Sequence, residues 1–549
     1  MIGTRYTKEL INEYISKGYW DPNLVCADFV EQCARDYPDK EAVIDSRARL
    51  TWREVNEQTD LIARGLIDMG FKKDDVIATQ LTNCVEYFLL FFAMEKAGVI
   101  IASAQPTFRQ AEMEPILRQV KAKAIIIKRK VRDFDYVSMV EEIRPRLPEL
   151  KDVIVIGDDV PPGTIAFTAL IDKARRKKRP TPLQKLFKPY EVTRIFNTSG
   201  TTGVPKCIER PIAPRIRSGK ILAQRMGLKH DDVVAAGWNL AAGGTELLAN
   251  VCVPLVGGKL VNIEQFSPQA VCELIQKEKI TVLAAVPAEI IRALDYPDLD
   301  KYDLSSLRII FTGTQLLTYE TGVQAEQRLN CRIVIIFGSG DTGPMCSTAY
   351  SDPQEIRLRT VGLPMEGNIV EIVDEKGNVL SPGEIGEVRA QGPTLVSGYF
   401  LNPELTKQCW QDGWFYTGDA GLKDAEGHIT LLGRKRDVIK RGGQIIYPFE
   451  VEAILAQHPK LTDVAIVRMP DKIMGEKQCA YVIPKKGQTF TMEEMASFLR
   501  SQKLAPYKIP ERLEVVSEFP MVAAGNKVDR NRLEQDIASK LKKESGSKS

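Results

Sequence analysis

The chain has 549 residues, enough for about three or four domain-sized units. Its 75 Lys and Arg nearly balance its 72 Asp and Glu, which argues against a surface built for nucleic acid or an anionic membrane. The sequence has only three histidines, and its ten cysteines form no C-x-x-C pair, which argues against a His-rich metal centre, a zinc or iron–sulfur site, or a disulfide scaffold.

The start of the chain and its most apolar stretch lack targeting and membrane-spanning patterns. Residues 1–10, MIGTRYTKEL, contain no apolar core of a secretory signal. The apolar stretch Tyr87–Met94 is interrupted by Glu95 and Lys96, far short of the ~20 residues that span a bilayer. We therefore expect a cytoplasmic protein that acts on a small molecule, with no nucleic-acid partner and no integral membrane segment. A homodimer is left open.

Helical and strand-like patterns alternate between about residues 20 and 150. Val55–Met69 carries apolar residues at helical spacing, whereas 123–128 and Val153–Ile156 are short β-branched runs typical of buried strands. This alternation predicts an α/β fold with largely parallel sheets. We interpret the basic run at 173–180, KARRKKRP, as a solvated loop or helix end rather than a binding patch.

The alternation continues through the middle of the chain and then changes. Pro268–Glu278 is typical of a helix and Thr281–Val286 of a buried strand. After about Glu366, short strand-like runs separated by Gly and Pro turns indicate a β-rich subdomain.

The charged segment 433–437, GRKRD, is typical of a connector between domains. The residues after it alternate helical and strand-like patterns, which predicts a compact α+β unit. We predict a large N-terminal domain over 1–432, made of two αβ subdomains and the β-rich subdomain. A hinge follows at 433–437, and then a small mobile α+β domain over 438–549. From Asp437 onward, Lys and Arg exceed Asp and Glu by four, so the basic excess lies in the small domain.

The strongest local signal is the segment 197–206, NTSGTTGVPK, directly after the apolar pair Ile195–Phe196. Glycines let backbone amides approach a polyphosphate, hydroxyl groups add donors, and Lys206 adds positive charge. The segment is not a P-loop of the Walker type, because Lys206 lies three residues after Gly203 and Cys207 follows where Ser or Thr would hold Mg²⁺. The pattern indicates phosphate binding.

This segment resembles the phosphate-binding signature of the adenylate-forming (AMP-binding, acyl/aryl-CoA synthetase) superfamily. Three later stretches are similar to that superfamily in order and spacing: 337–341 (FGSGD), 416–419 (YTGD) and 433–452 (GRKRDVIKRGGQIIYPFEVE). The resemblance covers about residues 20 to 535. It is closest to aryl- and alicyclic-acid ligases, such as cyclohexanecarboxylate– or benzoate–CoA ligase and 2,3-dihydroxybenzoate–AMP ligase.

The resemblance implies a ligase that activates a carboxylic acid with ATP, releases pyrophosphate, and transfers the acyl group from acyl-AMP to a thiol. Acid and ATP are both anions, and a like-charge pair near 4 Å costs about 1–4 kcal/mol at effective dielectric constants of 80 to 20. The reaction therefore needs cations and hydrogen-bond donors directed at the phosphates.

The resemblance also implies the residues that bind ATP or AMP, with Lys206 acting as a catalytic cation. These residues are Thr198, Ser199, Gly200, Thr201, Thr202, Gly203, Gly313, Thr314, Gln315, Phe337, Gly338, Asp341, Asp419 and Arg434. Phe337 would stack on adenine, Asp419 would accept hydrogen bonds from the ribose hydroxyls, and Arg434 would support the ribose or a phosphate. Asp341 stands where the superfamily usually has Glu and is the implied Mg²⁺ ligand, and Gly340 replaces the usual Thr.

For the second half-reaction the resemblance implies a rotation of the small domain about Asp437. Gly442 and Gly443 would line the coenzyme A tunnel. The catalytic Lys527 would bridge the acyl carboxylate and the α-phosphate during adenylation. One departure is that Asn526 separates the glycine at 525 from Lys527, where the superfamily has Gly directly before Lys.

The implied acyl pocket is lined by small and apolar residues: Trp238, Ala241, Ala242, Gly243, Gly338 and Gly362. Ala242 stands where dihydroxybenzoate-activating relatives carry Asn, which argues against a catechol and favours an apolar cyclic acid, cyclohexanecarboxylate or benzoate. A medium-chain fatty acid is the next alternative.

The expected cofactors are ATP, Mg²⁺ and coenzyme A. The basic small domain suits the phosphates of coenzyme A, although it also suits an acidic carrier protein, so an aryl-acid AMP ligase that loads a carrier in trans stays open. A non-catalytic nucleotide-binding protein is the alternative from another class.

Overall fold

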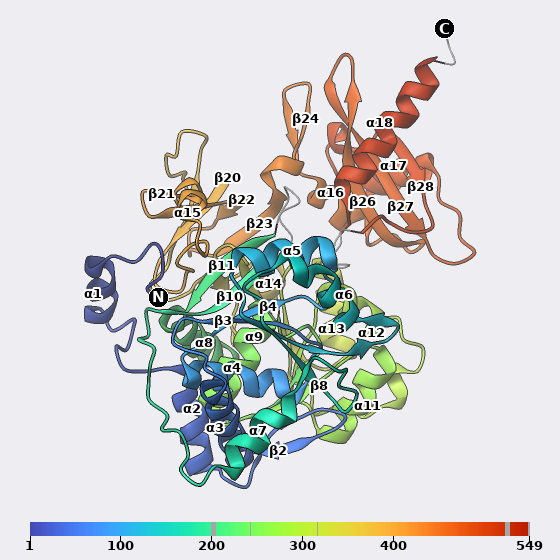
Figure 1. Cartoon of the computed structure of the whole chain (residues 1–549). Helices are drawn as coiled ribbons and strands as arrows, with labels where there is room; N and C mark the ends of the chain where they lie inside the picture. Colours follow the sequence, from blue (N-terminus) through green and yellow to red (C-terminus); the bar gives the residue numbers. More distant parts are fainter. Residues whose placement is uncertain (199–204, 242, 316, 522–527, 547–549) are drawn as a thin grey trace.

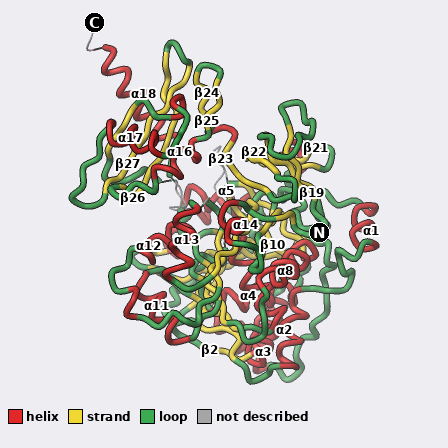
Figure 2. Tube along the Cα trace, turned by 180° about the vertical axis from the view of Figure 1, so that it is seen from behind, coloured by secondary structure: helices red, strands yellow, loops and turns green. Residues whose placement is uncertain are grey.

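A computed structural model describes residues 1–198, 205–241, 243–315, 317–521 and 528–546 (Figure 1). The chain forms a large body, followed by a smaller C-terminal unit that lies beside it. Both views show this separation (Figures 1 and 2), with the end of the last helix pointing away from the large body. The mixed α/β architecture with a large N-terminal and a small C-terminal domain confirms the predicted fold class.

The first sheet of the large body is parallel except at one edge. Its strand order is β11-β10-β4-β3-β5-β8-β9, and only the β10–β11 pair is antiparallel. In chain order the strands are β3 (Val76–Gln80), β4 (Ile100–Ala104), β5 (Ala124–Lys128), β8 (Asp152–Ile156), β9 (Ile165–Ala166), β10 (Val192–Thr198) and β11 (Lys206–Pro211). The two β-branched runs read from the sequence are β5 and β8. The β10–β11 hairpin carries the phosphate-loop segment between its strands.

The second sheet has a parallel centre with antiparallel strands at both ends, in the order β18-β17-β16-β15-β14-β12-β13-β1-β2. Its strands are β1 (Glu41–Ile44), β2 (Arg49–Thr51), β12 (Val233–Ala236), β13 (Lys259–Asn262), β14 (Val282–Ala284), β15 (Ile309–Thr312), β16 (Arg332–Ser339), β17 (Gly343–Ser347) and β18 (Leu363–Pro364). The central strands are buried on both faces, as their continuous apolar sequences require.

Two smaller antiparallel-rich sheets follow. The β-rich subdomain contains β19 (Ile369–Val373), β20 (Gly386–Gln391), β21 (Trp410–Gln411), β22 (Trp414–Lys423) and β23 (Ile429–Arg434). The C-terminal sheet contains β24 (Ile439–Arg441), β25 (Gln444–Ile446), β26 (Leu461–Asp471), β27 (Gly475–Pro484) and β28 (Arg512–Val515). A separate two-stranded ribbon pairs β6 (Lys130–Val131) with β7 (Phe134–Asp135).

The helices of the large body are α1 (Lys8–Ser16), α2 (Cys26–Asp36), α3 (Trp52–Asp68), α4 (Val85–Ala97), α5 (Gln110–Gln119), α6 (Tyr136–Ile143), α7 (Phe167–Arg176), α8 (Ile212–Met226), α9 (Gly243–Leu247), α10 (Val253–Val256), α11 (Pro268–Glu278), α12 (Pro287–Leu294), α13 (Tyr319–Arg328), α14 (Gln354–Arg359) and α15 (Pro403–Cys409). Those of the C-terminal unit are α16 (Pro448–Leu455), α17 (Met492–Ser501) and α18 (Arg530–Gly546). Helix α3 begins three residues before the predicted start because Thr51 and Glu54 form a capping box there. Among the described residues, none of the helices combines the length and the apolar composition that crossing a bilayer would need.

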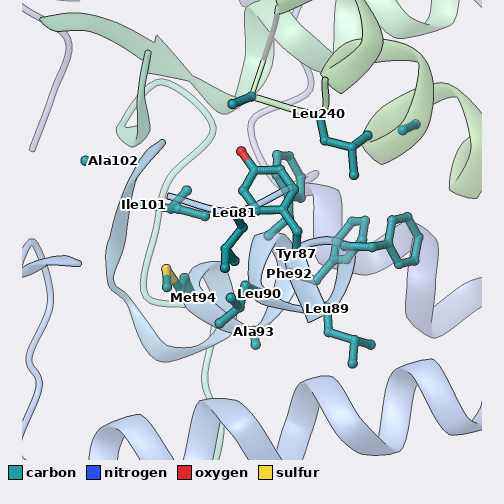
Figure 3. Packing of buried hydrophobic residues seen from close by; sticks show 14 of the residues in the cluster. Leu81, Tyr87, Leu89, Leu90, Phe92, Ala93, Met94, Ile101, Ala102 and Leu240 are labelled. Atoms are coloured by element: carbon teal, nitrogen blue, oxygen red, sulfur yellow. The ribbon is translucent and has the colours of Figure 1, made fainter. Parts of the chain in front are cut away.

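The core of the large body is centred on α4, which is buried on every side. A helix that is apolar all round must be enclosed by other elements, and α4 contacts α2, α3 and β4. Figure 3 shows its side chains, among them Leu90 and Met94, gathered with Leu81, Ile101 and Leu240. The core therefore reaches from the first sheet to the segment that follows β12, where the acyl pocket is expected.

Candidate active site

Three side chains meet where β11 begins, next to the phosphate-loop segment. The Tyr399 hydroxyl donates a hydrogen bond of 2.7 Å to Asp341 Oδ1, and Lys206 Nζ lies 3.4 Å from the same oxygen. Lys206 Nζ also lies 5.2 Å from the centre of the Tyr399 ring. Tyr399 is buried, but the side chains of Lys206 and Asp341 are 28% and 25% exposed, so a ligand can reach the cation and the carboxylate.

The Tyr399 phenol is held as a hydrogen-bond donor. Burial, and after it the negative charge of Asp341, raises the pKa of Tyr399 well above its usual value. The phenol therefore stays protonated at neutral pH and fixes one oxygen of the carboxylate. Among the described residues, the hydrogen bonds of the Asp341 carboxylate fall on Oδ1 and none falls on Oδ2.

Asp341 lies in the turn of the β16–β17 hairpin, and the turn depends on glycine. A Cβ on Gly338 would lie 2.2 Å from the Gly343 carbonyl oxygen, so no other residue fits there without moving the backbone. Ser339 N donates a 2.9 Å hydrogen bond to Thr342 Oγ1. Arg210 donates a 3.1 Å hydrogen bond to the Gly340 carbonyl. These contacts fix the backbone on both sides of Asp341.

The segment Gly313–Gln315 follows β15, the strand that lies parallel to β16 in the sheet. The carboxyl ends of the two strands therefore meet at one edge, the usual ligand-binding edge of such sheets. Thr314 has a φ of 71°, which is uncommon and strained for a residue with a Cβ. Phe337 packs in an apolar cluster with Phe196 and is 9% exposed. Its stacking on adenine stays a prediction.

Asp419 and Arg434 face each other across the β22–β23 pair. Arg434 Nε lies 3.1 Å from Asp419 Oδ1, and Arg434 also donates a 2.9 Å hydrogen bond to the Thr417 carbonyl. The structure thus brings together the two residues expected at the ribose. One apolar cluster, which includes Ile208 and Phe415, joins their sheet to β11 and β16.

The connector to the C-terminal unit is a short 3₁₀ turn, Lys435–Asp437. The Asp437 carboxylate lies 3.5 Å from Arg436 Nε. Beyond it, Gly442 and Gly443 form the two-residue loop of the β24–β25 hairpin, with φ angles of 54° and 85°. Two positive φ angles in such a loop favour glycine at both positions.

The stretch expected at the acyl pocket, residues 238–241 together with 243 and 244 (the acyl segment), follows β12. Trp238 and Ala241 are buried, and a Cβ on Gly244 would lie 3.2 Å from the Trp238 ring. A Cβ on Gly313 would lie 3.6 Å from the same ring, so Trp238 reaches the loop after β15. Gly362 packs against Ser347, since its Cβ would lie 2.1 Å from that carbonyl oxygen.

Some predicted site residues lie outside the described residues: Ser199, Gly200, Thr201, Thr202, Gly203, Ala242 and Lys527. Thr198 is the last residue of β10, where its backbone pairs with that of Lys206.

Sequence reasoning missed two residues of the site, Tyr399 and Arg210. Arg210 could have been found, because it lies four residues after Lys206 in a strand and so points to the same face. Tyr399 carried no such signal, since it reaches Asp341 from 58 residues away through the fold.

The residues fit a magnesium ion bound through a single carboxylate. Across the part of the chain that the structure describes, no cluster of three or more His, Cys, Asp or Glu side chains could hold a metal. Mg²⁺ keeps several waters and is commonly bound by one or two carboxylates together with substrate phosphates. Asp341, with Oδ2 available, meets that requirement.

Two family models match the chain in order. The AMP-binding enzyme model matches residues 30–400, and the AMP-binding enzyme C-terminal domain model matches residues 450–526. The medium-chain fatty-acid–CoA ligase of Escherichia coli (strain K12) is 30% identical over 533 residues, which cover 96% of this chain and 93% of the ligase. The 2,3-dihydroxybenzoate-AMP ligase of Bacillus subtilis (strain 168) is 30% identical over 541 residues and 98% of each chain. The crystal structure of the anthranilate CoA ligase AuaEII with anthranoyl-AMP superposes with a TM-score of 0.85 at 26% identity, covering 94% of this chain and 97% of that chain.

Proposed function

We propose that this chain joins a cyclic carboxylic acid to coenzyme A through an acyl-AMP intermediate. The chain belongs to the AMP-binding enzyme family and is an adenylate-forming acid ligase. The meeting of Lys206, Asp341 and Tyr399 beside the phosphate-loop segment carries this proposal. It supplies a cation and a metal-binding carboxylate where the reaction has to overcome the repulsion between two anions.

In the adenylation step, Lys206 neutralises charge on the β- and γ-phosphates, together with the backbone amides and hydroxyl groups of 198–203. A Mg²⁺ ion, when bound, adds positive charge at the phosphates, and Asp341 is its ligand. Tyr399 orients that carboxylate by donating to Oδ1. Lys527 bridges the acyl carboxylate and the α-phosphate.

The nucleoside is bound by the loop after β15 and by the β-rich subdomain. Gly313, Thr314 and Gln315 line the adenine on one side and Phe337 on the other. The Asp419 carboxylate accepts hydrogen bonds from the ribose hydroxyls, and Arg434, 3.1 Å away, holds that carboxylate in place.

In the thioester step, the C-terminal domain (438–549) turns relative to the N-terminal domain (1–432) about Asp437 in the hinge 433–437. The β24–β25 hairpin then approaches the acyl-AMP. Because Gly442 and Gly443 have no side chains, they leave room for a pantetheine arm.

The acyl group is a ring the size of cyclohexanecarboxylate or benzoate. The buried Trp238 ring supplies an apolar wall, while Ala241, Gly243, Gly338 and Gly362 add little or no side-chain bulk; Ala242 lies outside the described residues. Two relatives favour alternatives. Similarity to the Bacillus subtilis protein favours an aryl-acid AMP ligase that loads a carrier protein, and similarity to the Escherichia coli protein favours a medium-chain fatty acyl-CoA synthetase.

A panel of carboxylic acids tests the proposal. The full chain is incubated with ATP, Mg²⁺ and each acid, and acid-dependent ATP–pyrophosphate exchange is measured. AMP release is then compared with free coenzyme A and with a holo-carrier protein as acceptor. We expect cyclic acids with coenzyme A to react fastest. Faster reaction of acetate or long-chain acids would contradict the pocket assignment, and reaction only with the carrier would contradict the acceptor.

A further inference from the structure

Three buried arginines lie close to one buried carboxylate, and two of them pair with it. The cluster consists of Arg194, Arg210, Arg215 and Glu246, each less than 7% exposed. Glu246 places one oxygen 2.6 Å from Arg215 NH2 and the other 2.6 Å from Arg194 NH1. Both carboxylate oxygens are therefore taken, and Arg210 is left without a share of this charge.

Arg210 lacks an ionic partner of its own. Among the described residues, no carboxylate lies within 4 Å of its guanidinium. Its one hydrogen bond goes to the Gly340 carbonyl, and its buried Nε has no acceptor. Burial lowers the pKa of Arg210 to about 10, against the weaker attraction of Glu246 and Asp341, so the group stays charged at neutral pH. A buried cation with unused donors is costly unless an acceptor arrives from outside the chain.

The space beside Arg210 is a small pocket between the acyl segment and the hairpin that carries Asp341. Arg210 and Arg215 line it, together with Gly243 from the start of α9 and Thr394. Its volume of about 10 Å³ is roughly the space that one water molecule needs. The pocket can therefore take one oxygen atom of a substrate's substituent rather than a whole ligand.

Two glycines leave space directly beside the terminal nitrogens of the buried guanidinium. A Cβ on Gly243 would lie 3.4 Å from Arg210 NH2, and a Cβ on Gly343 would lie 3.4 Å from NH1. Any other residue at these positions would close over the donors. The next residue, Gly244, lies against the Trp238 ring instead, which provides an apolar wall. The acyl segment is thus apolar on one side and cationic on the other.

We propose that Arg210 is a specificity-determining residue that binds a second, anionic oxygen group on the cyclic acid, either a carboxylate or an acidic hydroxyl. This inference rests on the proposed function and narrows its substrate class. The ring lies against Trp238, the first carboxylate faces the phosphates, and the second oxygen group accepts hydrogen bonds from the Arg210 fork. A guanidinium suits such an acceptor because its donors are planar and permanently charged.

Matched acids on the full chain test the proposal by ATP–pyrophosphate exchange. Benzoate is compared with the monohydroxybenzoates and the benzenedicarboxylates, and cyclohexanecarboxylate with the cyclohexanedicarboxylates. We expect at least one substituted acid to exceed its parent by about tenfold or more in kcat/KM, because an unfilled buried donor penalises the parent acid.

The variant Arg210→Met removes the donors and keeps most of the volume. We expect it to abolish the preference by raising the KM of the substituted acid about tenfold relative to that of the parent acid, whose KM should stay the same. Any fall in kcat from the lost hydrogen bond to the Gly340 carbonyl should be equal for both acids. Arg210→Lys should restore part of the preference. The control Arg53→Met removes only an exposed ion pair with Asp39 on the surface and should change neither acid.

Each remaining outcome overturns the inference in a distinguishable way. An equal fall in kcat for all acids in Arg210→Met, with KM unchanged, would assign Arg210 to positioning the Gly340 carbonyl instead. A wild-type preference for unsubstituted acids contradicts the inference and leaves the proposed function intact. If none of the acids supports ATP–pyrophosphate exchange, the proposed function is contradicted, and the inference falls with it.

Discussion

The candidate site on the large body and the C-terminal unit are held in different ways. Around Lys206 and Asp341, strands from three sheets share one apolar cluster, so the cation and the carboxylate have fixed supports. Beyond Asp437 the apolar clusters are separate. In the described part of the chain, no such cluster contains residues from both sides of Asp437.

Polar contacts lie at the connector between the two units. Arg468 of β26 donates a hydrogen bond to the Arg436 carbonyl, and the Arg436 and Asp437 side chains lie 3.5 Å apart. Polar contacts near a surface contribute little and can be exchanged for water, whereas an apolar core resists separation. This contrast supports the proposal that the C-terminal unit turns about the connector while the supports of the phosphate site stay in place.

The phosphate site should carry the largest functional effect. Lys206→Met removes the cation beside Asp341 while keeping the length of the side chain. We expect acid-dependent ATP–pyrophosphate exchange to fall by about 10³, since removing one preorganised transition-state donor costs on the order of 10²–10³. Lys220→Met, an exposed lysine on α8, serves as the control and should leave the exchange unchanged. A loss below tenfold in Lys206→Met would remove the lysine from the catalytic set.

A lysine of the C-terminal unit should affect only one half-reaction. Lys527→Ala should lower adenylation by about 10², because the bridge between acyl carboxylate and α-phosphate is lost. Thioester formation from preformed acyl-AMP should be retained, because that step uses the other domain position. Both rates are measured on the same preparation, and Lys548→Ala is the matched control near the end of the chain. Equal losses in both half-reactions would contradict the assignment.

The hinge should show the opposite pattern. Asp437→Pro restricts φ at this position to about −65° and so opposes the backbone rotation. We expect thioester formation from acyl-AMP to fall about tenfold, with adenylation largely kept. A parallel measurement on Asp437→Ala separates the loss of the carboxylate from the loss of rotation. Normal thioester formation in the proline variant would place the hinge elsewhere.

The sequence was sufficient for the parts of the fold that depend on local patterns. The two β-branched runs predicted as buried strands correspond to β5 and β8, and the helix predicted over Pro268–Glu278 is α11. Motifs also made Asp419 and Arg434 candidate nucleotide-binding residues, but their 3.1 Å contact became evident only in the structure.

Contacts that depend on tertiary packing were not accessible in this way. Tyr399 reaches Asp341 through a hydrogen bond between segments far apart in the chain, and the sharing of Glu246 among arginines appears only once α8 and α9 are packed on β10. No periodicity marks such contacts, because burial of a charged residue is set by its neighbours in space rather than in sequence.

The difference between the two units should also appear in their response to pH, through Glu95 in α4. Burial raises the pKa of Glu95 to about 7, opposed by a hydrogen bond from Ala27 N and by the charges of Arg215 and Lys96. The folded state therefore holds a proton that the unfolded state releases near pH 4.5. Stability is lost as the pH rises from about 5 to 7, since the folded state binds more protons there.

Glu95→Gln should remove this dependence from the large body alone. Between pH 5 and 7, the unfolding free energy of the large body should decrease less steeply in the variant than in the wild type, by about 1 kcal/mol per pH unit. Unfolding is followed by thermal or denaturant melts at each pH, with the exposed Glu57→Gln on α3 as the control. The C-terminal unit has its own apolar cores, so its unfolding step should keep the wild-type pH dependence. An equal change in both steps would mean that the two units unfold as one, and that the connector at Asp437 couples them more strongly than its contacts indicate.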